Sequence, residues 1–259
     1  AGDTILVPDT RLRRVNRYLP DGTSAGGFPI PMTEGHTVRW QMTPAGLLAQ
    51  QIRSVVLPGE EDEGPRDDVV LLRGADGTIH DTLVAFPPGE VARTSDGAPT
   101  DAAPSFRFFD AEPTWTVDTH GRIIHGVNVE YNLQVQEPGA GTVRMFRKPT
   151  ARKRLTEADR DRILEMLRAT LVDQQGNPPT MWEMILPSVS FTDYYPAFNE
   201  ILAGPEGTLW VQHLRTAEEI ERAGAGLDPH SLGAPRWDIF DADGRFLGVP
   251  ELPHRFQPT

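Results

Sequence analysis

The sequence contains no cysteine and almost no lysine. The absence of cysteine excludes disulfides, thiolate metal sites and cysteine nucleophiles. The 259 residues include two lysines, Lys148 and Lys153, and both belong to the one basic run, "RKPTARKR". We interpret this run as a solvated loop that leads into a helix, with a binding patch as the alternative.

Long hydrophobic runs are also missing. No apolar stretch reaches the roughly 18 residues that a membrane-spanning helix needs, and no signal peptide is visible. The net charge of −12 argues against nucleic acid as a partner, because phosphate binding requires a clustered basic surface. The chain begins with Ala1 rather than Met, so we interpret it as processed, trimmed or incomplete, and the missing export signal carries little weight. The compartment stays open, and a full-length parent that is periplasmic, secreted or lipid-anchored is favoured.

The sequence is rich in turn signals, with 24 glycines and 24 prolines. Four segments share one pattern, in which an apolar run, a short polar turn ending in Gly and a second run follow one another: "LPDGTSAGG", "GADGTIHDTL", "EPGAGTVRMF" and "DADGRFLGV". A second set, "TPAGLLAQQI", "DTHGRIIHGV" and "GPEGTLWVQHL", alternates with the first along the chain. Each turn predicts a hairpin, and the alternation predicts repeated four-stranded antiparallel meanders.

One segment, "TEADRDRILEMLRATLVDQQG", has helical rather than strand periodicity. Thr156 is a candidate N-cap, and acidic residues follow it in the first turn. An apolar stripe of Ile163, Leu164, Leu167 and Leu171 predicts one buried face. We therefore expect a helical insertion at residues 156–176, packed on a sheet face rather than used to bind a partner.

The segments "ILVPDTRLRRVNRYLPDG", "YPAFNEILAGPEGTLWVQ" and "WDIFDADGRFLGVPELP" resemble bacterial six-bladed β-propeller proteins of the NHL- and TolB-like group. The resemblance implies an all-β propeller with about four blades present, approximately at residues 1–30 (partial), 36–86, 106–149 and 190–253. A complete ring of this type has six blades, so we expect a single, incomplete propeller domain with one or two unpaired sheet edges.

The segment "WDIFDADGRFLG" has the Asp-x-Asp-Gly signature of a calcium loop. With Gly244 at position 6 of an EF-type loop, Ile239 falls at position 1 and Pro250 at position 12, where oxygen ligands are required. The register therefore excludes this loop type and favours a hairpin turn.

The segment "SFTDYYPAFNE" supplies the best ligand-binding candidates, because segments that lead into a blade of a propeller lie near its central channel. We predict that Asp193, Tyr194, Tyr195 and His213 bind a ligand. The alternative is that the two tyrosines pack between blades.

No serine elbow, nucleotide-binding loop or HExxH motif is present, so no catalytic residue is predicted. We expect a non-enzymatic binding or scaffold module for a peptide, glycan or protein, with no cofactor. The alternative is a lactonase, hydrolase or lyase-like propeller enzyme with a divalent metal in its channel. Its candidate ligands are Asp118, Asn128, Asp193, Asn199 and His213.

Overall fold

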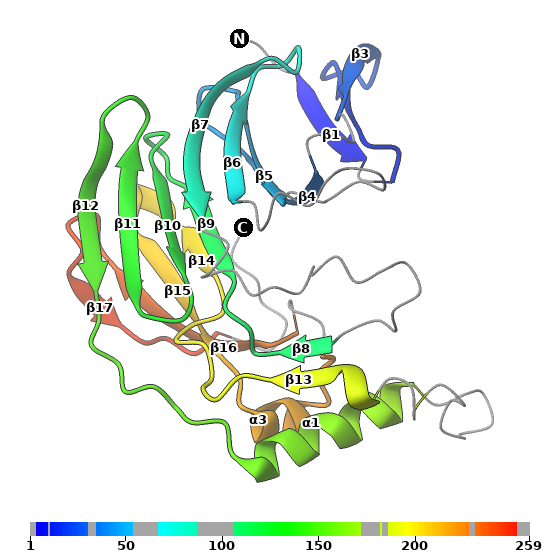
Figure 1. The fold of residues 1–259 in the computed structure, drawn as a ribbon. Helices are drawn as coiled ribbons and strands as arrows, with labels where there is room; N and C mark the ends of the chain where they lie inside the picture. The colour runs from blue at the N-terminus through cyan, green and yellow to red at the C-terminus, as the bar shows by residue number, and fades with distance from the viewer. Residues whose placement is uncertain are drawn as a thin grey trace. The chain divides into compact units, whose positions relative to one another are not determined.

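Short strands, many of them joined by glycine turns, are the main regular structure of the described residues (Figure 1). The computed structural model describes residues 4–9, 11–30, 35–53, 67–86, 106–171, 182, 186–227 and 231–252. The chain divides into two compact units. Unit 1 comprises Ala1–Val91, Thr116–Ile124 and Gln134–Arg144, and unit 2 comprises Ala92–Trp115, His125–Leu133 and Met145–Thr259.

Unit 1 contains two sheets of consecutive strands. The first has three antiparallel strands in the order β1-β2-β3, which span Ile5–Asp9, Arg14–Tyr18 and Ser24–Pro29. The second is a four-stranded antiparallel meander, β4-β5-β6-β7, whose strands span His36–Met42, Leu48–Arg53, Asp68–Arg73 and Ile79–Phe86. Four buried side chains of this unit form a core cluster: Val15, Phe28, Ile30 and Leu48.

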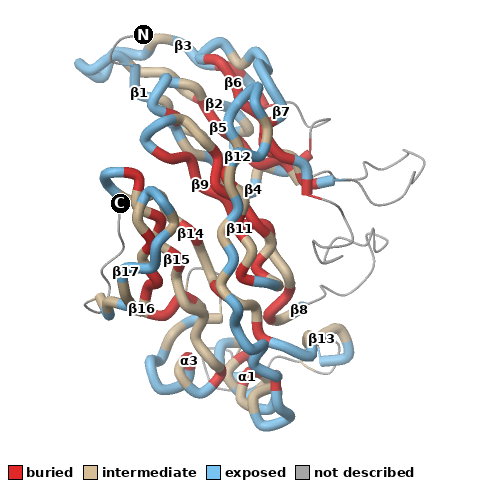
Figure 2. The backbone as a smooth tube through the Cα atoms, turned by 90° about the vertical axis from the view of Figure 1, so that its left-hand side faces the viewer, coloured by how far each residue is buried: buried red, intermediate tan, exposed pale blue. Residues whose placement is uncertain are grey.

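Two further sheets follow the same meander order. One contains β9 (Pro113–Val117), β10 (Ile123–Val127), β11 (Asn132–Glu137) and β12 (Gly141–Arg147), and its strands contribute to both units. The other lies in unit 2 and contains β14 (Ile201–Ala203), β15 (Leu209–Leu214), β16 (Gly233–Phe240) and β17 (Phe246–Gly248). Figure 2 shows that β9 is buried, whereas the edge strands β12 and β17 are largely exposed.

These sheets confirm the predicted fold class, an all-β protein made of four-stranded antiparallel blades of β-propeller type. The turn at Gly244 illustrates why the glycine pattern predicted them. Gly244 has a φ of 83°, a conformation that disfavours other residues, and its N–H donates to the Asp241 carbonyl at 2.9 Å. Asp241 Oδ1 accepts from the N–H groups of Asp243 and Arg245, so it stabilises a hairpin turn, as predicted.

The predicted helix is present as α1, Glu157–Thr170, and part of its predicted end, residues 172–176, lies outside the described residues. The Thr156 hydroxyl accepts from the Asp159 N–H, and the Asp159 carboxylate accepts from the Thr156 N–H, which completes a capping box. Of the predicted apolar stripe, Ile163 and Leu167 are buried, whereas Leu164 and Leu171 are partly exposed.

Three elements next to α1 were not predicted from the sequence. The strands β8 (Phe106–Phe108) and β13 (Val189–Phe191) form a short parallel pair. A second helix, α3, spans Ala217–Ala223 and packs against α1, as Figure 1 shows. A shared core cluster joins these elements, with buried members Phe109, Leu155, Ile163, Tyr195, Ala217 and Ile220. None of the helices in the described ranges is both long and apolar enough to cross a membrane.

Close packing between β10 and β11 gives the first testable prediction. A Cβ added at Gly126 would lie 2.6 Å from the backbone oxygen of Asn132, which cannot move without disturbing the sheet. We expect Gly126→Ala to lower the free energy of unfolding by about 2–3 kcal/mol in a urea titration.

The matched control is Gly224→Ala, at the C-cap of α3 in the same unit. Gly224 has a φ of 57° and no atom within 4 Å of an added Cβ, so this change costs only backbone strain, about 1 kcal/mol. Equal losses for the two variants would contradict the packing argument.

Candidate functional site

Strand β16 carries a carboxylate on a buried face. Asp238 pairs in register with Val211 of β15 and lies two residues before Phe240, so these side chains share one face of the sheet. Val211 and Phe240 are both buried, and the Asp238 side chain is 1% exposed. A carboxylate in such surroundings is stable only if hydrogen-bond donors surround it.

Three side chains from other strands or their ends supply those donors. The Tyr131 hydroxyl donates to Asp238 Oδ2 at 2.8 Å, and the Lys148 ammonium donates to the same oxygen at 2.5 Å. His213 Nε2 lies 2.9 Å from Asp238 Oδ1. Because an ionised carboxylate only accepts hydrogen bonds, His213 carries a proton on Nε2.

Local backbone structure explains how these donors reach one point. Tyr131 immediately precedes β11 and Lys148 immediately follows β12, and the Lys148 N–H donates to the Tyr131 carbonyl at 3.1 Å. His213 lies where the β15–β16 register shifts, between Gln212 and Leu214. Such irregularities redirect side chains, and this one brings His213 to Asp238.

Aromatic rings surround the cluster. The Tyr131 ring packs edge-on against Phe198, with centroids 5.4 Å apart, and contacts Phe240 at 6.1 Å. The Lys148 ammonium lies 5.0 Å from the centroid of the Phe246 ring. These rings exclude water from the carboxylate, which strengthens its hydrogen bonds.

The hydrogen bonds determine the protonation of the cluster. Burial alone would raise the pKa of Asp238, but hydrogen bonds from His213, Lys148 and Tyr131 outweigh burial and lower this pKa to about 2. Burial raises the pKa of Tyr131 far above its ordinary value, and the adjacent Asp238 charge raises it further. At neutral pH the site therefore holds an ionised Asp238 and a neutral Tyr131.

A cavity of about 560 Å³ in unit 2 is lined by three members of this cluster, Tyr131, Lys148 and His213. We call it the basic pocket, because its lining contains four Lys or Arg side chains and a single carboxylate, that of Glu130. The four cationic residues are Arg147, Lys148, Arg152 and Lys153. Both lysines of the sequence therefore lie at this pocket, and the basic run interpreted as a solvated loop forms part of its wall.

Two of these cations are positioned by tyrosine rings. The Arg152 guanidinium lies 4.4 Å from the centroid of Tyr194, and the Lys153 ammonium lies 5.7 Å from that of Tyr195. Within the described residues, neither cation has a carboxylate at ion-pair distance. A ring orients a cation without neutralising it, so both positive charges persist at the pocket.

Tyr195 connects the pocket wall to the helices. Its ring is buried against Phe109, with centroids 4.7 Å apart, and its hydroxyl accepts from the Ala217 N–H at the start of α3. Burial raises the pKa of Tyr195 well above its ordinary value, so its hydroxyl is neutral at physiological pH.

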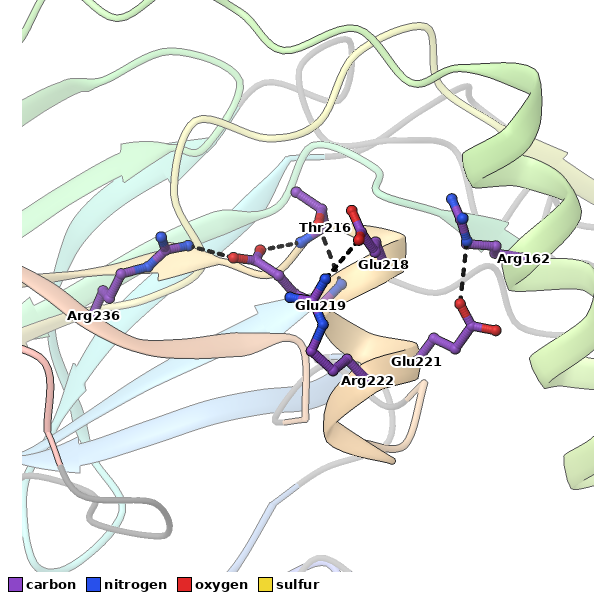
Figure 3. A network of polar contacts seen from close by, with 7 residues as sticks. All are labelled: Arg162, Thr216, Glu218, Glu219, Glu221, Arg222 and Arg236. Atoms are coloured by element: carbon purple, nitrogen blue, oxygen red, sulfur yellow. Dashed lines mark hydrogen bonds and ion pairs between the residues drawn. The ribbon is translucent and has the colours of Figure 1, made fainter.

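A polar network ties α3 to the strand that carries Asp238 (Figure 3). The Glu219 carboxylate accepts from the Thr216 N–H at 2.8 Å and from Arg236 of β16 at 2.8 Å. Thr216 also lines the basic pocket. The network continues to α1 through an ion pair between Arg162 and Glu221 at 3.2 Å. Hydrogen bonds of Glu219 thus link the pocket wall, the start of α3 and β16 within unit 2.

The structure brings two of the four predicted ligand-binding residues to this pocket. Tyr195 and His213 line it, whereas Tyr194 is the ring beneath Arg152. Asp193 is 78% exposed and lies 3.5 Å from Arg160. Tyr195 is 4% exposed, but it packs in the core cluster around α1 and α3 and not between blades, as the alternative had it.

The residues proposed as metal ligands are engaged in separate local contacts. Asp118 Oδ2 accepts from the Arg122 side chain at 2.7 Å in the β9–β10 turn. Asn128 accepts from the Glu112 N–H, and the Asn199 amide donates to the Gln212 side chain at 2.9 Å. Over the part of the chain that the structure describes, no three His, Asp or Glu side chains converge as a metal site would require.

The Asp238 cluster does not fit a divalent cation either. Oδ1 of Asp238 is occupied by His213, and Oδ2 by Tyr131 and Lys148. The Lys148 ammonium already holds the position of a counter-cation, so a metal would face a positive charge and no free carboxylate oxygen.

The sequence analysis missed Tyr131, Lys148 and Asp238 as site residues. Two signals were available. Asp238 interrupts the apolar face that Phe240 continues in "RWDIFDA", and the lysines are confined to six residues of the chain. Tyr131 carried no comparable signal, because tyrosine is ordinary in a strand.

The low pKa of Asp238 gives the second prediction. A carboxylate whose pKa falls on folding stabilises the protein above its unfolded pKa of 3.8, and this contribution is lost as pH falls toward 2. We expect Asp238→Asn to be less stable by about 2 kcal/mol at pH 7, as measured by urea unfolding, and the difference to shrink between pH 4 and about pH 2.

Asp161→Asn, at an exposed position of α1, is the matched control, with a change below about 0.5 kcal/mol at every pH. A stability difference for Asp238→Asn that stays constant down to pH 2 would show that the charge of Asp238 is not what the cluster stabilises.

Comparisons with known proteins do not show a family for this chain. No family model matches the sequence, and no curated protein matches it. Solved structures with similar folds include a catalytically inactive virginiamycin B lyase from Staphylococcus aureus with quinupristin, at 11% identity and a TM-score of 0.41. They also include a DUF4221 family member from Bacteroides vulgatus, at 10% identity and a TM-score of 0.47.

The alignments cover 96% and 97% of this chain, but 52% of the lyase and 64% of the DUF4221 protein. The chain thus spans about half the length of the lyase. At such low identity and TM-score, neither likeness carries an argument about ligand or reaction, and the blade topology above is the basis of the fold assignment.

Proposed function

We propose that this chain is a non-enzymatic ligand-binding module of β-propeller type and that the basic pocket receives the ligand. The ligand is a small molecule, or the end of a peptide or glycan chain, that fits a cavity of about 560 Å³. The observation that carries the proposal is the Asp238 cluster, because its three donors line this cavity and are fixed before any ligand arrives.

The size and lining of the pocket support binding. Ligand pockets typically enclose about 300–1,000 Å³ and combine apolar walls with a few fixed polar groups. Here Pro149, Ala151 and Pro196 supply apolar wall, while Lys148 and His213 supply polar groups whose positions Asp238 holds. A preformed site of this kind loses little conformational entropy on binding.

The enzyme alternative is favoured by one feature, the orientation of His213 by a buried carboxylate. Such a pair is used for proton transfer, with the carboxylate bound to one ring nitrogen and the other nitrogen facing the substrate. At the Asp238 cluster a metal would have to displace Lys148, Tyr131 or His213, which favours a metal-independent version of this alternative. A location outside the cytoplasm stays a prediction from the sequence.

A screen of fluorinated fragments by ¹⁹F NMR tests the proposal. We expect hits whose binding is lost in Ala151→Trp, because the indole would fill the pocket from an exposed loop position that tolerates substitution. Backbone amide shifts should place the same hits at Tyr131 and His213.

Ala75→Trp is the matched control, since Ala75 is an exposed turn residue in unit 1. Hits should bind this variant as they bind the wild type. An absence of hits, or hits that Ala151→Trp leaves unchanged, would rule out the basic pocket as the binding site.

A further inference from the structure

We propose that the ligand carries an oxyanion group, a phosphate or a carboxylate, and that Arg152 and Lys153 hold it. This inference rests on the proposal that the basic pocket receives a ligand, and it adds the chemical class of that ligand. It follows from the charges of the pocket lining, from the partners that each cation already has, and from the tyrosine rings that position two of the cations.

The first argument is the local balance of charge. The chain as a whole has a net charge of −12, with 37 acidic and 25 basic residues. The pocket reverses this ratio, because its lining contains four Lys or Arg side chains and Glu130 as the single carboxylate. A concave site lined by one sign of charge concentrates its field and attracts ligands of the opposite sign.

The second argument separates the cations by their partners. Lys148 is neutralised by Asp238 at 2.5 Å, and Arg147 contacts the Asn132 side-chain oxygen at 3.4 Å. Arg152 and Lys153 are exposed, and within the described residues neither forms an ion pair, although Asp159 and Glu219 lie close enough to Lys153 to interact with its charge. These two charges, and that of the exposed Arg147, are therefore the ones that a ligand can meet.

The third argument is that the two cations are positioned. Arg152 lies over the Tyr194 ring, and Lys153 approaches the Tyr195 ring, which is itself fixed by the start of α3. The Tyr195 N–H also donates to the Lys153 carbonyl at 2.9 Å, which holds the backbone of the loop. Side chains held in this way lose less entropy when an anion binds.

The geometry of the cations defines the ligand class. An arginine fork and an adjacent ammonium match the planar oxygens of a carboxylate or the tetrahedral oxygens of a phosphate. Near them, the neutral ring of Tyr195 and the apolar Ala151 and Pro196 accommodate the uncharged remainder of the ligand. The structure thus favours a compact organic anion over a long neutral chain.

Titration with simple anions tests the inference. Inorganic phosphate and citrate, each added at ionic strength matched with sodium chloride, should shift the backbone amides of residues 147–153 in ¹⁵N-correlated NMR spectra. We expect the dissociation constant to rise roughly tenfold or more in the double variant Arg152→Gln/Lys153→Gln, because two charged donors are lost. Raising the ionic strength should weaken binding in the wild type.

The matched control is Arg168→Gln/Arg245→Gln, which removes the same charge from exposed positions of unit 2 outside the pocket lining. It should bind within about twofold of the wild type, since distant exposed charges are largely screened. Binding of phosphate alone would identify a phosphate-bearing ligand, and binding of citrate alone a carboxylate-bearing one.

The inference is overturned if neither anion shifts these amides more than chloride does, or if both double variants bind alike. Its failure is distinguishable from failure of the proposed function. Fragments that still bind in the pocket while anions do not would leave a binding module with an uncharged ligand. Fragments that bind nowhere in the pocket would remove both proposals.

Discussion

The buried charge of Asp238 is the constraint on which the organisation of unit 2 depends. A carboxylate with 1% exposure must have its oxygens satisfied, and among the described residues Tyr131, Lys148 and His213 satisfy them. These hydrogen bonds hold the start of β11, the end of β12 and the irregular part of β15 against one residue of β16. The pocket is a by-product of that convergence, because the same donors form part of its wall.

The cations at the basic pocket have two different roles, one structural and one available for binding. Lys148 completes an internal ion pair whose partner is almost fully desolvated, so its charge belongs to the fold. Arg152 and Lys153 lie on the loop between β12 and α1, where rings rather than carboxylates orient them. A protein that is acidic overall therefore keeps a small basic site by separating structural cations from available ones.

Local structure could be predicted from the sequence, but the distant side chains that meet at Asp238 could not. Gly244 predicted a hairpin because a turn depends on a few neighbouring residues. Thr156 predicted a helix start because an N-cap interacts only with the next three residues. His213 was predicted as a ligand-binding residue, but its partner Asp238 was not. Its contact with Asp238 crosses 25 positions, and that of Tyr131 crosses 107, so no local pattern encodes either contact. The parallel pairing of β8 with β13 was missed for the same reason.

The scarcity of lysine has a practical consequence for labelling. Apart from the amino terminus, Lys148 and Lys153 are the primary amines of the sequence, and both lie at the basic pocket. The Lys148 ammonium is committed to Asp238, whereas Lys153 is exposed. Of the two lysines, an amine-reactive dye would therefore modify Lys153 first, so a chain whose amino terminus is blocked would carry a single-site reporter at the basic pocket.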